Sequence, residues 1–202
     1  MHVGVAVKSP PCSVAEGLTP QRRRSLQRAL DFHKAHLEIA EEDEQWVAHT
    51  NIGLCLGMLA GAASADAANH HQEALRVSLE QQDAAGQAVA VGNLGILAMR
   101  QGGAANAANA ENCLLQHLRL VQDLCNAEAE VGALMHLGDL HASRGDHEKA
   151  LEMFEKASQV AQTQGAVSTY KRITCSVGLA KGRLTMDDYF NDLAAKVLPT
   201  VK

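Results

Sequence analysis

The sequence predicts an all-α protein, built as a right-handed superhelical solenoid of stacked helical hairpins. The 202-residue chain has only four prolines and is rich in strong helix formers. Its apolar residues recur three to four positions apart, as on one face of a helix. A glycine-centred phrase returns at Gly4, Gly53, Gly95, Gly138 and Gly178, at intervals of 49, 42, 43 and 40 residues. Because a short hairpin cannot bury its apolar stripe alone, we expect such copies to stack on one another.

The best-defined hairpin lies within residues 134–161. Gly138 and Ala150 are small where its two helices must approach each other closely. Gly145, in the turn between them, can adopt the positive φ of a helix C-terminal cap. The second helices of the other copies align with this one, beginning near Ala29, Ala67 and Ala110.

The recurring phrases resemble those of a known family. Asn51-Ile52-Gly53, Asn93-Leu94-Gly95 and His36-Leu37-Glu38-Ile39-Ala40 resemble the tetratricopeptide repeat (TPR). The spacing is closer to its longer variant of about 40 residues per unit, carried by rapsyn and the GoLoco-binding spindle-orientation adaptors. The resemblance covers nearly the whole chain. It implies a superhelix of TPR hairpins that binds other proteins.

We expect one array over residues 1–202. Residues 1–43 would form a partial first repeat with a long loop over 8–18, where Pro10-Pro11 excludes helix. Three repeats would follow over 44–83, 84–125 and 126–165. Residues 166–202 would supply one more first-position helix and a capping helix.

Local signals set the expected helix boundaries. Thr19 is an N-cap followed by Pro20 at the first helical position, and that helix is expected to run to about Asp43. Gly102-Gly103 and Gly165 mark breaks, and Ala85-Gly86 is expected to separate two units. The remaining helices are expected over 46–60, 65–82, 87–101, 106–124, 127–143, 146–164 and 167–182.

A separate last helix is expected to begin at Thr185, with Asp188 completing a variant of the capping box and Pro199 stopping the helix. Because a solenoid exposes an apolar face at its end, we expect this helix to cover the last repeat. Its apolar edge would consist of Met186, Tyr189, Phe190, Leu193 and Val197.

Composition narrows the function classes. A net charge of −5 and a pI near 6.0 do not indicate a nucleic-acid-binding surface. The three consecutive arginines at 22–24 are typical of a solvated helix face. The longest apolar run is too short to cross a membrane, and the N-terminus lacks the basic start of a secretory signal. Five cysteines without CxxC spacing indicate reduced, mostly buried thiols. We therefore expect a cytoplasmic protein, free or attached to a cytoskeletal or ciliary assembly.

Histidines are the candidates for chemistry. His136, Asp139 and His141 lie close in sequence, and a metal-dependent enzyme centred on them is one hypothesis. However, His141 and His147 stand where the repeat usually carries aromatic packing residues. No cysteine joins the group, and no nucleophile motif or phosphate loop is present. We expect no catalytic residue, no metal and no cofactor.

The resemblance implies that the first-position helices line a concave groove. Asn51 and Asn93 match an asparagine that in related proteins hydrogen-bonds a bound peptide; the alternative is that they cap local backbone groups. The groove would otherwise be small and apolar, with adaptable methionines. The predicted partner-binding residues are Val47, Thr50, Asn51, Leu54, Val89, Asn93, Ile96, Met99, Met135, His136 and Asp139.

The function expected from these features is a non-enzymatic scaffold that holds a protein segment, peptide or helix, in its concave groove. The Lys, Arg and Asn clamp of cochaperone repeats is missing, because Thr50, Leu54, Gly132 and His136 stand at those positions. The alternative is a structural component of a cytoskeletal or ciliary (axonemal) assembly. That component would contact its neighbours through edges and loops such as residues 8–18.

Overall fold

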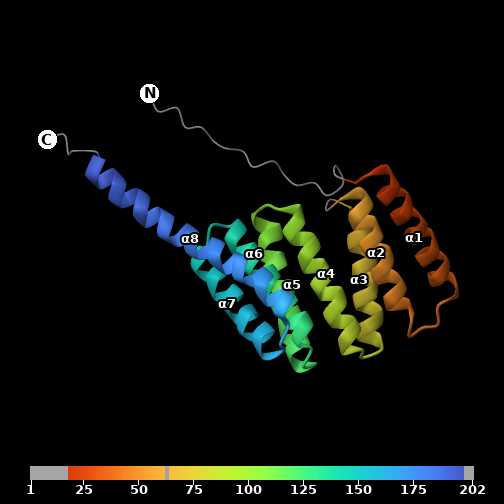
Figure 1. The fold of residues 1–202 in the computed structure, drawn as a ribbon. Coiled ribbons are helices and arrows are strands. Elements are labelled where there is room, and N and C mark those ends of the chain that lie inside the picture. Colours follow the sequence, from red (N-terminus) through yellow and green to blue (C-terminus); the bar gives the residue numbers. More distant parts are fainter. Residues whose placement is uncertain (1–17, 62–63, 198–202) are drawn as a thin grey trace.

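The computed structural model describes residues 18–61 and 64–197, and within them it contains eight α-helices and no strand (Figure 1). The predictions for residues 1–17, for Pro199 and for the middle of the 61–64 turn lie outside the described residues. The helices are α1 (Pro20–Ile39), α2 (Gln45–Ala60), α3 (Ala65–Glu80), α4 (Ala84–Gln101), α5 (Ala104–Asp123), α6 (Ala127–Ser143), α7 (His147–Thr163) and α8 (Val167–Val197).

The helices stack in chain order, from α1 at one end to α8 at the other (Figure 1). Each packs on the helix before it and the helix after it, and α4 also contacts α2 and α6 directly. We call α2, α4, α6 and α8 the inner helices, and α1, α3, α5 and α7 the outer helices. The architecture is an all-α solenoid, as the sequence predicts.

The signature glycines occupy equivalent places. A Cβ built on Gly53 would lie 2.6 Å from the His71 ring, and one on Gly95 would lie 3.0 Å from Leu114. A Cβ on Gly138 would overlap the ring of Phe154. In each case the glycine of an inner helix lies under a side chain of the outer helix that follows it. The repeated phrase therefore marks the point of closest approach within each hairpin.

The core lies both within and between hairpins. One cluster joins Val131 and Leu134 of α6 to Ala157 of α7 and Ile173 of α8. A second joins Leu114 of α5 to inner-helix leucines of α6. Each hairpin therefore buries apolar surface on its neighbours, as expected for stacked repeats.

Side-chain caps explain where several helices begin. The Thr19 hydroxyl accepts a hydrogen bond from the Arg22 N–H (3.3 Å), as predicted. The expected start of α4 at residue 87 is wrong, because the Asp83 carboxylate accepts from the N–H groups of Ala85 and Gly86. Both residues therefore belong to the first turn of α4.

Two other boundaries differ from the expected ones. α1 ends at Ile39 and not near Asp43, because Ala40 has extended backbone (ψ 134°). α5 begins at Ala104, directly after Gly103, which has positive φ. Gly145 and Gly165 have φ of 77° and 65°, which confirms the predicted C-terminal cap at each.

The largest difference concerns α8. The expected break before Thr185 is wrong, because α8 continues as one helix of 31 residues. The Thr185 hydroxyl donates to the carbonyls of Lys181 and Gly182 within that helix, so it does not act as an N-cap. The second half of α8 consequently projects beyond α7 and does not fold back over the last hairpin (Figure 1).

Candidate binding surface on the inner helices

A pocket of about 110 Å³ lies between the C-terminal halves of α2 and α4. Leu54 and Met58 line it from α2, and Asn93, Ile96 and Arg100 line it from α4. Leu54 and Met58 are 42% and 44% exposed, so apolar surface is open to a ligand here. The pocket brings together three residues that the sequence places in a groove: Leu54, Asn93 and Ile96.

A second pocket occupies the equivalent place two hairpins further on. It measures about 460 Å³ and lies between the C-terminal half of α6 and the middle of α8. Asp139 directly follows its signature glycine, as Leu54 does, and Arg183 lies five residues past the next one, as Arg100 does. Leu179 replaces Ile96, and Phe154 of α7 replaces His71 of α3 at the back of the pocket. The repeat therefore builds the same pocket twice.

The intervening space between α4 and α6 is occupied by Met99. Its equivalents are Gly57 in the first pocket and Ala142 in the second. Met99 packs against the cluster that contains Leu137 and Leu140 of α6. A small residue at the position of Met99 leaves space for a pocket between two inner helices. The long methionine side chain instead fills the corresponding space between α4 and α6.

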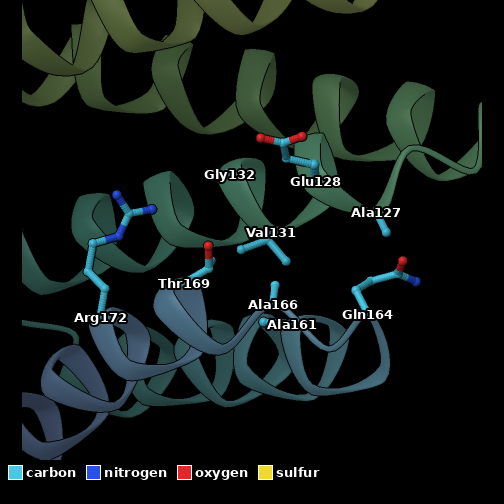
Figure 2. A pocket seen from close by; sticks show the side chains of 9 residues that line it. All are labelled: Ala127, Glu128, Val131, Gly132, Ala161, Gln164, Ala166, Thr169 and Arg172. Atoms are coloured by element: carbon cyan, nitrogen blue, oxygen red, sulfur yellow. The ribbon is translucent and has the colours of Figure 1, made fainter.

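A third pocket, of about 510 Å³, lies between the N-terminal halves of α6 and α8 and the end of α7. Figure 2 shows Val131 and Thr169 between the two inner helices, with Arg172 toward one end and Gln164 toward the other. Glu128 adds an acidic group on the α6 side. This pocket is more polar than a simple apolar groove would be.

Each of these three pockets has one exposed arginine in its lining. Arg100, Arg172 and Arg183 are exposed, and within the described part of the chain none of them forms an ion pair with a carboxylate. The pockets therefore have available positive charge beside them.

His136 and Asp139 lie on the same inner surface. Desolvation lowers the pKa of His136, with Arg100 and Arg172 lowering it further and Asp139 opposing them. Desolvation raises the pKa of Asp139, and His136 opposes it. The buried Nδ1 of His136 has no hydrogen-bond partner in the described residues.

The predicted asparagines are free of local bonds. Neither the Asn51 nor the Asn93 side chain makes a hydrogen bond to any described residue, so neither caps a backbone group there. Asn93 lines the first pocket. Val47 is half-buried, and Val89 is 39% exposed.

Other predicted groove residues are part of the packing. Thr50 is only 5% exposed, so its side chain offers little surface to a ligand. Met135 packs against clusters that join α6 to α7 and α8. Met99 and Ile96 pack against the cluster between α5 and α6, although Ile96 also reaches the first pocket.

Sequence reasoning missed the three arginines. The sequence does contain a signal for two of them, because Arg100 and Arg183 each lie five residues after a signature glycine.

The chemistry candidates separate in space. His141 is buried, with its Nε2 4.0 Å from Glu111 of α5, while His136 lies on the inner surface. Across the described residues, no group of three or more His, Cys, Asp or Glu could hold a metal ion. None of the helices described here has the length and apolar character needed to cross a membrane.

The cysteines divide into buried and exposed. Burial raises the pKa of the Cys55 and Cys113 thiols, which suits inert packing residues. Cys175 is exposed, in contrast to the mostly buried thiols expected, because no described helix covers that side of α8. Cys125 is also exposed, in the turn after α5.

Comparison with known proteins identifies the fold. No protein-family model matches the sequence, and no curated protein matches it. Among solved structures, it is similar to a signal transduction ATPase with numerous domains (STAND) from Pyrococcus horikoshii that has a tetratricopeptide repeat sensor (TM-score 0.73, 14% identity). The match covers 87% of this chain, which spans only 27% of that protein.

A second similar structure is BtubC (BKLC) from P. vanneervenii, with a TM-score of 0.63 and 16% identity. This match covers 90% of the chain and 79% of BtubC. At these identities the likeness shows a helical repeat fold. The assignment to the longer repeat variant stays a prediction.

Proposed function

We propose that this protein is a non-enzymatic interaction scaffold that holds a segment of a partner protein along its inner helices. The observation that supports this most is the repeated pocket, at α2–α4 and again at α6–α8, built from the same register positions. The exposed apolar residue is Leu54 of α2 in the first pocket and Leu179 of α8 in the second, where Asp139 stands at the register of Leu54. An exposed arginine, Arg100 or Arg183, lies at the same register beside each pocket. Two such pockets along one solenoid suit side chains from one extended or helical segment.

The charge pattern suggests the chemistry of the partner. Arg100 and Arg183 would attract carboxylates next to the inserted apolar side chains. We infer an amphipathic segment with acidic residues flanking its apolar anchors. Its binding would weaken as salt rises, because exposed charge pairs are screened.

The test uses peptides selected on the intact protein from a random display library, with affinity measured by calorimetry. Leu54→Glu should weaken a selected acidic peptide at least tenfold, because it places a charge in the apolar mouth of the pocket, and Arg100→Gln should weaken it less. Leu79→Glu is the matched control, since Leu79 is 55% exposed on the outer helix α3 and should leave affinity unchanged. Equal affinity for wild type and Leu54→Glu, or an equal loss with Leu79→Glu, would exclude the pocket.

The second candidate is a fixed component of a cytoskeletal or ciliary assembly. The exposed apolar residues of α8, such as Phe190 (54% exposed), favour it because a stable neighbour would cover them. Such a component should aggregate or degrade when expressed alone, whereas a scaffold with reversible partners should be recovered as a soluble protein. Cytoplasmic localisation stays a prediction from the sequence.

A further inference from the structure

Among the described helices, none lies over α8 as an outer helix. Gly53, Gly95 and Gly138 each lie under a side chain of the following helix, but a Cβ on Gly178 would meet nothing within 4 Å. The same is true of Gly182, one turn further on. Two glycines one turn apart leave a stretch of α8 without side chains, which another helix could approach closely.

The second half of α8 has the apolar spacing of an outer helix. In α7, the residues facing α6 include Ala150, Phe154 and Ala157, at intervals of four and three. Met186, Phe190 and Leu193 repeat those intervals, with Phe190 at the place of Phe154. All three are exposed, at 48%, 54% and 41%.

This segment cannot cover its own glycine. α8 is continuous from residue 167 to 197, so Phe190 lies twelve residues along the same straight helix from Gly178. At 1.5 Å per residue, that separation is about 18 Å. Only the same segment of another molecule can bring Phe190 over Gly178.

We propose that two copies of this protein pair through α8, antiparallel and about a two-fold axis, with Phe190 of each copy over Gly178 of the other. An antiparallel arrangement reproduces the direction in which α7 runs on α6. It is isologous, so both copies bury the same surface and the assembly closes as a dimer.

The neighbouring positions agree with this register. Around Gly138 and Phe154, Met135 packs against the cluster that contains Ala157, and Ala142 packs against the cluster that contains Ala150. The corresponding pairs in the dimer are Cys175 with Leu193, and Gly182 with Met186. A small residue therefore faces a large one at each position.

The distribution of charged residues along α8 favours pairing with a second, antiparallel copy. The first half of α8 (167–182) carries Lys171, Arg172 and Lys181 and no acidic residue, although Lys181 also pairs with Glu155 of α7. The second half (183–197) carries three aspartates, Asp188 among them, against two basic residues. Antiparallel pairing places the basic half of one helix beside the acidic half of the other. A parallel pair would instead place like charges together.

The first test is the mass of the full chain in solution, measured by light scattering during size-exclusion chromatography over a dilution series. The wild type should run at twice the 21.5-kDa chain mass at the higher concentrations. Phe190→Glu and Gly178→Leu should both run at the single-chain mass with unchanged helical circular dichroism. Phe32→Glu is the matched control, because Phe32 is 74% exposed on α1, and it should keep the wild-type mass.

A cross-link separates pairing from a folded-back segment. L193C places a thiol opposite Cys175 of the second copy, so mild oxidation should give a covalent dimer whose peptides join positions 175 and 193 of different chains. Within one straight helix these positions are about 27 Å apart, too far for a disulfide. A single-chain mass for the wild type, an unchanged mass for Phe190→Glu, or a disulfide within one chain would overturn the proposal.

Discussion

Gly138 is the residue at which the hairpin packing tolerates least change. Its missing Cβ would overlap the Phe154 ring, whereas a Cβ on Gly132 of the same helix would meet nothing within 4 Å. Gly138→Ala should destabilise the protein by about 1–3 kcal/mol, because a buried aromatic ring must shift. Gly132→Ala should instead stabilise it by about 0.5–1 kcal/mol through helix propensity. Urea unfolding of the two variants checks this, and equal effects would contradict the glycine-centred packing.

His71 makes stability depend on pH. It is 3% exposed over Gly53, and burial lowers its pKa to about 4, with His70 contributing. The unfolded chain therefore binds a proton near pH 6.5 that the folded chain does not, so stability is complete above that pH and falls as pH drops toward 4. Burial also lowers the pKa of His117 and His136, in the same direction.

His71→Phe should reduce this acid sensitivity, because phenylalanine occupies the equivalent place over Gly138. The measurement is the urea midpoint at pH 7.5 and pH 5. We expect a smaller difference between the two in the variant than in the wild type. An unchanged difference would mean that other groups carry the acid response.

At the scale of the helix, side-chain caps set the boundaries. Asp83→Ala removes two hydrogen bonds to the first turn of α4 and should cost about 1 kcal/mol. Glu44→Ala is the control, since Glu44 occupies the same position before α2 but makes no side-chain cap bond. Its effect should be within a few tenths of a kcal/mol. Chemical unfolding measures both variants, and the Asp83 cap has no role if they behave alike.

Two helix boundaries could not be predicted from composition. Ala85-Gly86 has the composition of a helix break. Both residues are nevertheless in the first turn of α4, because the Asp83 side chain caps that turn. Gly182 and Thr185 likewise suggest a helix boundary inside α8. Unlike proline, however, both residues keep a backbone N–H that can donate a helical hydrogen bond. The Thr185 hydroxyl donates to the Lys181 and Gly182 carbonyls of the same helix. Composition alone does not distinguish a cap from a helix interior when no proline is present.

The sequence predicts which residues of the inner helices occupy equivalent repeat positions, but not how deeply each one is buried. Counting from the signature glycines places Leu54 and Asn93 correctly at the first pocket. The same count could not tell that Thr50 is buried or that Met99 packs on α6, because both depend on how closely neighbouring hairpins approach. The two equivalent pockets have Gly57 and Ala142 at the register position of Met99.

At the scale of the whole molecule, the fold follows from repetition. Each hairpin buries its apolar stripe on its neighbours, and α4 contacts both α2 and α6. Few contacts link helices distant in sequence, so stability should be a sum of local terms rather than one cooperative core. The damage from a substitution should then spread only to adjoining hairpins.

Hydrogen exchange measured by mass spectrometry on wild type and Gly138→Ala tests whether the hairpins are stabilised locally. We expect faster exchange in α6 and α7 and in the adjoining α5 and α8, with α2 and α3 unchanged. An equal increase in exchange through every helix would contradict this expectation, because it would show one indivisible core in place of a stack of dependent repeats.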